Sequence, residues 1–541
     1  MSYIKKFGDN TSPTGKQGIY FAKKTYESKP LPTFEKIKEK LPNPVFDEDL
    51  DYIKCYWKAW ELAFRNFHEP SSGSGFVSQF IDAAFNENIF LWDTCFMTMF
   101  CNYAHPYVPG ISSLDNFYAK QHEDGEICRE INRTTGRDFH YWVNIEGEPL
   151  FSRWGYDWDK ELKKESIIYR GRRAPKPNPK LTLDALNHPI FAWAELESYR
   201  MTGDKARLKL VWQPLVRYYE ALRKYLRQGN GLYMTDSASM DNSTRNVWLR
   251  NGGAAIDISS EMVLFARNLS EIAAILGMES EAKIYEKSAY ELSRLINRNM
   301  WDSDNSFYYD LTFDEKRVPV KTIAGFWALI AGVANDTRAK ALTEELGDPE
   351  TFGTLHKVPT LAADQDGFNA ETGGYWRGSV WAPTTMMVIR GLEKYGFDEL
   401  ARTIALNHLE NVVTVFKETG TIWENYAPKK VAQGAPAKPD FVGWSGIAPI
   451  LFLIEYAIGI KANAVTNTIT WDIRSLGRVG IERFWFSGKT LSLVCEEPDS
   501  DQKRSIKVTS EDTVDLMVRA ADRVEHVKVP AGKPIKLVIQ Y

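Results

Sequence analysis

The sequence predicts a mainly α-helical protein: a closed ring of helical hairpins, followed by a small all-β domain. Three observations support this fold class. Apolar residues recur at helical spacing through most of residues 48–460. The connections between the expected helices alternate between tight turns and long loops. After residue 465, short runs rich in Val, Ile and Thr alternate with polar residues, which is typical of strands.

Composition excludes several classes of protein. A chain of 541 residues with 44% hydrophobic and 26% charged residues can form several domains or one large fold with an appendage, and it is not disordered. The net charge of −4 gives no reason to expect a nucleic acid or a membrane as partner. The 17 Trp, 25 Tyr and 28 Phe mildly favour a carbohydrate ligand, because aromatic rings stack on sugars, although aromatic residues also fill large cores.

Residues 1–47 are expected to be a lead-in, because they contain Pro and many Lys without firm periodicity. Residues 48–460 are expected to hold about twelve helices, several of them bounded by Gly or Pro. These helices are expected near residues 48–66, 90–103, 111–123, 183–202, 205–228, 257–277, 279–300, 321–334, 336–346, 379–395, 397–417 and 445–459.

The connections indicate how the helices assemble. Tight turns at 202–204 and 395–398 contrast with long loops at 229–256 and 347–377. Hairpins joined in this way suggest a closed ring with the long loops gathered on one functional face. An open helical solenoid is the alternative, but its repeats would be more alike in sequence.

Residues 465–541 are expected to form the β domain. Strands are expected at 468–471, 491–494, 505–508, 514–518 and 535–539. The run Phe484-Trp485-Phe486 also alternates as a strand does, and its rings are expected to pack inward or against the helices.

Cysteine usage and the N-terminal residues bear on the compartment. The five cysteines include no CxxC pair, so neither a zinc site nor a thioredoxin-like motif is expected. Cys95 and Cys101 lie in an apolar stretch and are expected to be buried. The start has no apolar core of a signal peptide, and no run of 18 apolar residues occurs. We therefore expect a cytoplasmic protein without a membrane span, or a periplasmic or secreted one if a signal peptide was removed.

Two early segments combine aromatic and polar residues. Segment 85–94 ends in Trp92-Asp93, where the carboxylate could bind sugar hydroxyls while the indole packs on the ring. The alternative role for Asp93 is that of a helix N-cap. Segment 121–127 carries Gln121 and Asp124 at the end of an apolar helix, and taken alone it is more typical of a capped, solvated loop.

Later loops carry further candidates. The long loop 229–245 holds Asp241 and Arg245 among small polar residues, which is also ordinary turn composition. An acid there needs burial or a nearby like charge to stay protonated, and Arg245 opposes that unless its charge is engaged elsewhere. Segments 373–383, 420–428 and 441–446 are rich in Trp, and their alternative role is core packing. Burying Arg377 or Glu424 among indoles is costly unless each is paired or used.

Five motifs together resemble a known family. They are Trp92-Asp93, MDNSTR at 240–245, YWRG at 375–378, ENYAP at 424–428 and GWS at 443–445, in this order. They are similar to the inverting glycosidases of family 63, especially the short bacterial mannosylglycerate hydrolase-like enzymes. The resemblance covers about residues 48–460. The chain departs from those enzymes in a longer region after residue 300 and in the added β domain.

The resemblance implies an (α/α)6 barrel in which Asp241 is the general acid and Glu424 the general base. The residues expected at the sugar are Trp92, Asp93, Gln121, Asp124, Arg245, Tyr375, Trp376, Arg377, Trp381 and Trp444. Inversion needs a protonated and an ionised carboxyl about 6.5–9.5 Å apart, with a water between them. No metal and no cofactor is expected.

The sequence therefore favours an exo-acting, inverting hydrolase of small α-linked glucosides, mannosides or galactosides. Its expected partner is such an oligosaccharide or glycoside, and nothing indicates an oligomeric state. Two alternatives remain. A polysaccharide lyase or sugar epimerase on a helical toroid is disfavoured because only 8 His occur, and only His122 lies in these segments. A sugar-binding protein without activity is disfavoured because both Asp241 and Glu424 are present.

Overall fold

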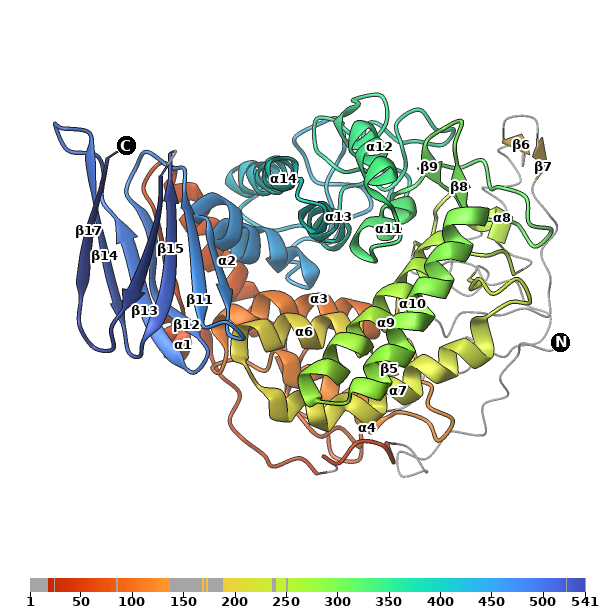
Figure 1. The fold of residues 1–541 in the computed structure, drawn as a ribbon, viewed down its shortest axis with the longest axis horizontal. Helices are drawn as coiled ribbons and strands as arrows, with labels where there is room; N and C mark the ends of the chain where they lie inside the picture. The colour runs from red at the N-terminus through yellow and green to blue at the C-terminus, as the bar shows by residue number, and fades with distance from the viewer. Residues whose placement is uncertain are drawn as a thin grey trace.

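The computed structural model describes residues 18–23, 25–83, 86–136, 168–169, 172–173, 188–235, 240–249, 252–521 and 523–540. The chain is mostly helical up to residue 458 and β-rich after it, as the sequence predicts. Figure 1 shows the two parts side by side, with the strands of the C-terminal part packed against one end of the helical part.

Inner helical segments make a cycle of contacts. These segments are α3 (Leu91–Cys101), α6 (Phe191–Thr202), α9 (Ile256–Leu276), α11 (Trp327–Ile330), α13 (Ala382–Lys394) and the π-helix η8 (Ile447–Ile458). Each contacts the next along the chain, and η8 contacts α3. Every residue of α3 and of η8 is buried, as expected for helices that are covered on all sides.

Outer helices cover this cycle. They are α2 (Leu50–Arg65), α4 (Asp115–Ala119), α7 (Lys205–Leu226), α10 (Glu279–Asn299), α12 (Asp336–Gly347) and α14 (Asp398–Thr419). The longer of them are amphipathic, because only one side is covered: α10 buries Tyr285, Leu292 and Ile296 and exposes its charged residues. The tight turn after α6 is closed by Gly203 in the left-handed conformation, and Asp204 caps α7 by accepting from the N–H of Arg207.

The remaining short helices are α1 (Phe34–Ile37), α8 (Asn246–Leu249), η1 (Lys38–Lys40), η2 (Asn102–Ala104), η3 (Ile111–Leu114), η6 (Ile323–Phe326) and η7 (Trp444–Gly446). Two expected helices are shorter than predicted. The helix expected at 111–123 ends at Ala119, and that expected at 321–334 is a 3-10 turn followed by four α-helical residues. Gly325 lies against the Phe307 ring, so the backbone there follows packing rather than helical periodicity. Residues 183–187 of the helix expected at 183–202 lie outside the described residues.

The β-rich region is a two-layer sandwich. One sheet has the order β1-β12-β13-β14-β17 and the other β10-β11-β15-β16, and every pairing is antiparallel except β11 with β15. The strands are β1 (Asn43–Phe46), β10 (Ile460–Asn463), β11 (Thr468–Ile473), β12 (Val479–Phe486), β13 (Lys489–Cys495), β14 (Lys503–Ser510), β15 (Val514–Ala520), β16 (Arg523–Val529) and β17 (Ile535–Gln540). Alternate residues of β14 and β15 are buried between the layers.

Two strands tie the sandwich to the helical region. β1 comes from the expected lead-in and pairs with β12. The Phe484 and Trp485 rings of β12 pack on Tyr103 and His105 beside η2, which confirms the expected inward packing. Four further pairs of short strands occur in the sequence before residue 310: β2 (Phe67–His68) with β3 (Phe80–Ile81), β4 (Asn88–Phe90) with β5 (Glu130–Asn132), β6 (Ile168–Tyr169) with β7 (Arg172–Arg173), and β8 (Trp301–Asp302) with β9 (Phe307–Tyr308).

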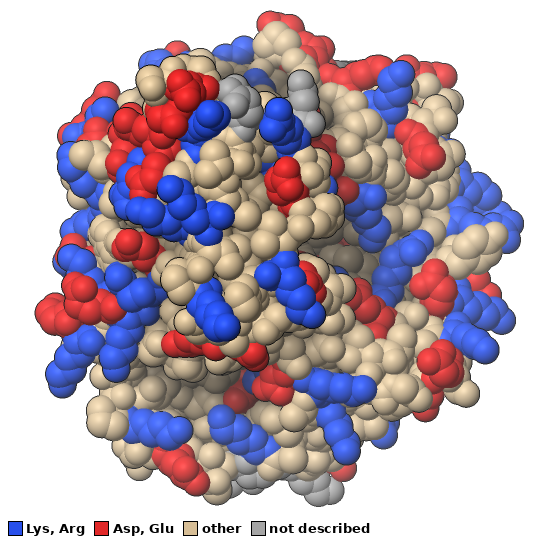
Figure 2. Space-filling view, turned by 60° about the vertical axis from the view of Figure 1, so that its left-hand side comes forward, with Lys and Arg blue, Asp and Glu red and all other residues tan. Residues whose placement is uncertain are grey.

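Surface and core agree with the composition. Acidic and basic side chains are interspersed over the face drawn in Figure 2, in line with the small net charge. All five cysteines are free and buried, as expected for Cys95 and Cys101. Within the described part of the chain, no helix combines the length and the apolar character that crossing a membrane requires.

Candidate active site

The candidate residues stand where the inner segments begin. Trp92 and Asp93 lie in the first turn of α3, and Trp381 immediately precedes α13. Trp444 begins the 3-10 turn that leads into η8. Asp241 lies in the turn before α8, and Glu424 lies in the loop after α14. The predicted gathering of the long loops at one face therefore brings these side chains toward the same end of the helical region.

Asp241 carries a buried carboxyl with a raised pKa. Burial raises the pKa of its carboxyl to about 6, Arg129 opposes this rise, and Glu130 adds to it. Arg245 does not act on it, because its guanidinium bonds Asp257 and lies 3.1 Å from Asp310. The condition set by the sequence, that the charge of Arg245 be engaged elsewhere, is thus met.

Glu424 is buried but strongly hydrogen-bonded. One carboxylate oxygen accepts from the Tyr375 hydroxyl at 3.1 Å, and the other accepts from the Lys438 N–H at 3.0 Å. Burial raises the pKa of Glu424 to about 7, these two hydrogen bonds lower it, and the Asp241 charge raises it. Asp241 is therefore close enough to affect the protonation of Glu424, and Glu424 is the more hydrogen-bonded of the two.

Asp93 adds a third carboxyl to this group. It is only 4% exposed. Its pKa is raised well above the usual range, first by burial and then by the charges of Glu130, Asp82 and Asp241. Burial and the neighbouring carboxylates therefore oppose ionisation of Asp93.

Tyr375 contacts Glu424 and lies within reach of the charges of Asp241 and Asp93. Burial and the charges of Glu424, Asp241 and Asp93 all raise its pKa, so its hydroxyl stays a hydrogen-bond donor. The Tyr375 backbone is left-handed, with φ of 67°, which is uncommon for a residue with a side chain. Asn242 holds this loop: its carboxamide accepts from the Trp376 N–H at 2.8 Å and donates to the Gly374 carbonyl at 2.9 Å.

Four indoles surround the carboxyls. Trp376 stacks on Trp381 with centroids 4.3 Å apart and an interplanar angle of 6°. Trp92 lies 6.3 Å from Trp376, and Trp444 lies 5.6 Å from Trp381. The Trp444 N–H donates to the Glu424 carbonyl at 3.2 Å. Trp381 and Trp376 are both almost fully buried.

The structure places other predicted residues in contacts within the protein. Gln121 is buried, and its amide donates to the Gly125 and Pro214 carbonyls. Asp124 is exposed and accepts from the Tyr225 hydroxyl at 2.6 Å. Arg245 is fully buried in the ion pairs described above. Arg377 donates to the Gly367 carbonyl at 3.0 Å, a contact that joins two parts of one loop.

Arg129 and Glu130 were missed from sequence. They form an ion pair, and β5 pairs with β4 so that Glu130 lies opposite Phe90, next to the first turn of α3. The only available signal was their position just after segment 121–127. Asn242 lies inside one of the five motifs but was given no role. Among the described residues, no group of three His, Cys, Asp or Glu is arranged to hold a metal ion.

Comparisons with known proteins agree with this picture. The family model of the mannosylglycerate hydrolase MGH1-like glycoside hydrolase domain matches residues 161–445, which include Asp241, Tyr375, Trp376 and Glu424. An uncharacterized protein of Borreliella burgdorferi is 28% identical over 397 residues, 69% of this chain and 81% of that protein. A mannosylglycerate hydrolase of Rubrobacter radiotolerans is 31% identical over 194 residues, 35% of this chain and 41% of that protein.

Solved structures show a shared fold. The GH63 mannosylglycerate hydrolase from Thermus thermophilus in complex with glucose has a TM-score of 0.54 and 18% identity, over 73% of this chain and 99% of that chain. An α-L-rhamnosidase from Dictyoglumus thermophilum has a TM-score of 0.57 and 12% identity, over 93% of this chain and 50% of that chain. A match over 93% necessarily includes part of the β-rich region after residue 460.

Proposed function

Because the chain belongs to the mannosylglycerate hydrolase MGH1-like glycoside hydrolase family, we propose that this glycosidase is exo-acting and inverts the anomeric carbon of small α-linked glucosides, mannosides or galactosides. We infer that its inner and outer helices form an (α/α)6 barrel, which the contact cycle and the GH63 neighbour support. The bound sugar lies at the end of the barrel where the inner segments begin.

The roles of the two carboxyls follow from their surroundings. Asp241 holds a proton and delivers it to the glycosidic oxygen as the bond to the leaving group breaks. Glu424 removes a proton from the water that attacks the opposite face of the sugar ring. Two hydrogen bonds to the Glu424 carboxylate favour its ionised form, whereas no described residue donates a comparable bond to Asp241. After one turnover the proton lost by Asp241 equals the proton gained by Glu424, and exchange with water restores the starting state.

One observation carries the proposal: Asp241 and Glu424 are both buried in the candidate site with raised pKa values of about 6 and about 7, and the Asp241 charge contributes to the rise at Glu424. Both carboxyls therefore titrate near neutral pH. The higher value belongs to Glu424, so these values alone place a proton on Glu424 before Asp241. The assignment of the acid role to Asp241 rests instead on the motif resemblance and on the two hydrogen bonds that favour ionised Glu424. Trp92, Trp376 and Trp444 then offer ring faces to the sugar, and Asp93 and Tyr375 offer hydrogen bonds to its hydroxyls.

The test is the anomeric form of the first product. Aryl α-glycosides, small α-linked disaccharides and mannosylglycerate, the substrate in the name of the Rubrobacter relative, are incubated with the enzyme and followed by proton NMR. We expect the β-anomer to appear first. Initial release of the α-anomer indicates retention and contradicts the proposal. Elimination or epimerisation products support the lyase or epimerase alternative.

Asp241→Asn separates the acid from a structural role. We expect a loss of about 10²–10⁴-fold in kcat on natural glycosides and a much smaller loss on aryl glycosides with good leaving groups, because those need less protonation. Asp124→Asn, at an exposed carboxylate, is the matched control. Equal losses on both substrate classes contradict the acid role of Asp241.

A further inference from the structure

A cavity of about 480 Å³ lies at the other end of the inner helical segments. Its lining comes from the last turns of α3 and α13, from η2 and the end of α11, from the length of α6, the C-terminal two thirds of α9 and the middle and end of η8, and from β10. On α13, Trp381 precedes the first turn, whereas the cavity residues Arg390 and Lys394 are in the last two turns. At 1.5 Å per residue, the two ends of this helix are roughly 20 Å apart. A molecule in this cavity is therefore separate from the candidate active site.

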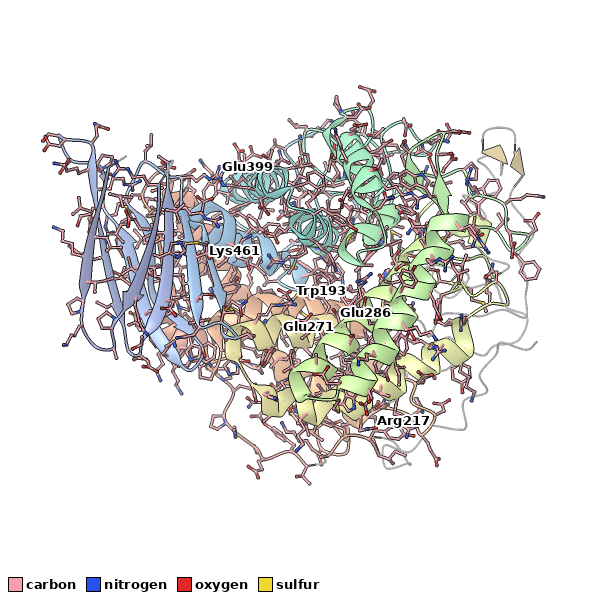
Figure 3. All side chains as sticks on the ribbon, in the orientation of Figure 1. Trp193, Arg217, Glu271, Glu286, Glu399 and Lys461 are labelled. Carbon is pink, nitrogen blue, oxygen red and sulfur yellow. The ribbon has the colours of Figure 1, made fainter. Side chains whose placement is uncertain are left out.

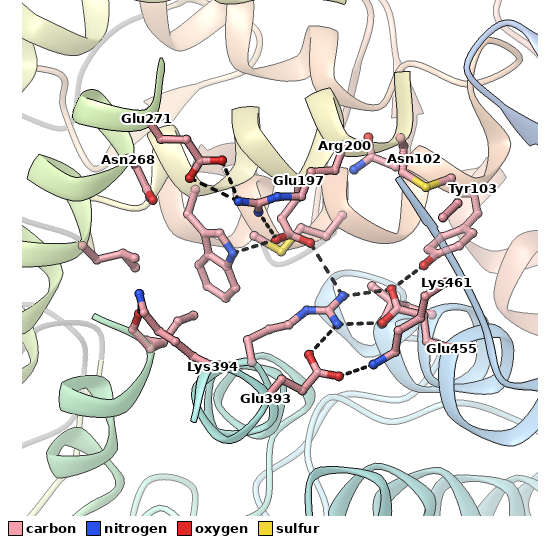
Figure 4. Close-up of a pocket in the computed structure, with 18 of the residues that line it drawn as sticks. Asn102, Tyr103, Glu197, Arg200, Asn268, Glu271, Glu393, Lys394, Glu455 and Lys461 are labelled. Carbon is pink, nitrogen blue, oxygen red and sulfur yellow. Dashed lines mark hydrogen bonds and ion pairs between the residues drawn. The ribbon is translucent and has the colours of Figure 1, made fainter. Parts of the chain in front are cut away.

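Acidic residues of the cavity already have partners. Arg390 binds Glu455 and Glu393 at 2.7 and 3.0 Å. Arg200 binds Glu197 and Glu271 at 2.9 and 3.0 Å. Figure 4 shows this network, with Glu455, Glu393 and Lys461 on one side of the cavity. Figure 3 locates Trp193 and Glu271 among the helices and Lys461 where the helices meet the sandwich. These carboxylates do not need a ligand.

Two cations on the opposite side are less well compensated. The Lys394 ammonium donates to the Ile330 carbonyl at 3.1 Å and forms no ion pair with a described residue. The nearest contacts of the Arg267 guanidinium are 3.6 Å to Glu286, which is 56% exposed, and 3.5 Å to the Gly332 carbonyl. Arg267 thus has one long ion pair to an exposed carboxylate and Lys394 has none among the described residues, so the two neighbouring positive charges are only partly compensated.

Asn268 adds a polar group without a partner. Its side chain lines the cavity, is only 7% exposed and makes no hydrogen bond to a described residue. Figure 4 shows the Asn268 and Lys394 side chains reaching toward each other from α9 and α13. Its amide is not among the fully enclosed polar groups that lack a partner, so it is open to the space of the cavity. An oxyanion placed here would accept from it and from both cations.

The walls define the rest of the ligand. Trp193, Leu264, Ile330 and Leu451 give the cavity an apolar lining beside the cations. The volume is within the range of about 300–1,000 Å³ that is typical of small-molecule sites. The exposed Arg200 and Lys461 at its edge, 38% and 42% accessible, leave it open to solvent.

We propose that this cavity binds a small organic oxyanion, whose carboxylate or phosphate group lies between Lys394, Arg267 and Asn268 and whose body packs on Trp193. The site is independent of glycoside hydrolysis, so its test does not depend on the proposed function.

The protonation of Lys394 on binding can be measured as proton uptake. Burial lowers the pKa of Lys394 to about 8. The charges that face it are those of Arg267 and Arg200, which lower the pKa further, and those of Glu271 and Glu286, which raise it. A bound anion raises this pKa, so binding near pH 8 takes up protons.

Isothermal titration calorimetry at pH 8 and constant ionic strength uses three probes: malate, inorganic phosphate and glycerol 3-phosphate. We expect binding of malate or of glycerol 3-phosphate, with an enthalpy for malate that depends on the ionisation enthalpy of the buffer. Tighter binding of malate identifies a carboxylate ligand. Tighter binding of glycerol 3-phosphate than of inorganic phosphate identifies a phosphate ester held by the apolar wall.

Lys394→Met and Arg267→Met should each weaken binding by about tenfold, and Lys394→Met should abolish the proton uptake. If either variant fails to fold, Asn268→Ala is a second test that removes no charge. Circular dichroism shows whether each variant is folded. Lys287→Met, at a 76% exposed residue of α10 outside the cavity, is the control. No binding of any probe by the intact enzyme, or equal binding by the variants and the control, overturns the proposal.

Discussion

Single residues set the protonation of the candidate site. Tyr375 is the clearest case, because its unusual backbone conformation aims one hydroxyl at a region that three carboxyls share. Backbone strain of this kind persists only where the surrounding structure holds it, and here Asn242 supplies the two hydrogen bonds that do so. The geometry of Glu424 thus depends on a residue two loops away.

Tyr375→Phe removes the hydrogen bond that lowers the pKa of Glu424. The base must be ionised, so we expect the acidic limb of the kcat/KM profile to move to higher pH by about one unit. We also expect kcat/KM at its optimum to fall about tenfold, the size of one hydrogen bond to a charged group. The control is Tyr225→Phe, because the Tyr225 hydroxyl contacts Asp124, away from the site. An unmoved acidic limb contradicts this role.

Asn242→Asp keeps the acceptor for the Trp376 N–H but places an oxygen against the Gly374 carbonyl. We expect kcat to fall at least tenfold while KM changes little, because the acid and the base lose their alignment but the indoles remain. Steady-state kinetics decides, with the melting temperature as a check. A variant that loses stability but keeps kcat shows that Asn242 is structural only.

Glu424→Gln has an effect on stability that depends on pH. The folded-state pKa of Glu424, about 7, lies above its ordinary value of 4.5. Below about pH 4.5 Glu424 is protonated in both the folded and the unfolded state, and its ionisation costs no stability. As the pH rises through 7, the free energy of unfolding falls, because the buried charge costs up to about 3 kcal/mol. We expect the melting temperature of the variant, relative to wild type, to increase from pH 4.5 to pH 8. A decrease over this range contradicts the raised pKa.

The sequence predicts some helices and strands accurately and misses others. Long amphipathic helices such as α7, α9 and α14 were predicted to within two residues, because their apolar spacing is regular and Gly residues end α9 and α14. β1 was not predicted, since its four residues gain their strand conformation only from β12, far along the chain. Asp241, Glu424 and the indoles were named from motifs. The contributions of Arg129 and Glu130 were not, because they arise from the pairing of β4 with β5.

Arg390 links three inner segments and so tests the importance of their packing. It lies on α13 and binds Glu455 of η8, and Glu197 of α6 is 3.6 Å away. Arg390→Met leaves the buried Glu455 carboxylate with only the Tyr103 hydroxyl, so we expect a loss of about 3–5 kcal/mol in stability. Activity at 25 °C should change little, because the site is at the other end of the helices. Denaturant unfolding is the measurement, and Arg223→Met, in an exposed ion pair, is the control.

The whole molecule depends on the sandwich. β12 packs on η2 and pairs with β1, which leads directly into α2. A chain ending near residue 462 leaves β1 unpaired and uncovers Tyr103. We expect this truncated chain to be insoluble or to melt at a much lower temperature, with no gain in selectivity. If it melts normally and loses activity on one oligosaccharide only, the sandwich is a sugar-binding module.

The pairing of Asn43 with Glu482 also has a consequence for synthesis. These residues are 439 positions apart, so at about 5–20 residues per second the partner of β1 leaves the ribosome roughly 20–90 s after β1 itself. During that interval β1 is a nascent edge strand with free N–H and carbonyl groups. Its brevity and its proline, Pro44, limit pairing with other chains while it waits.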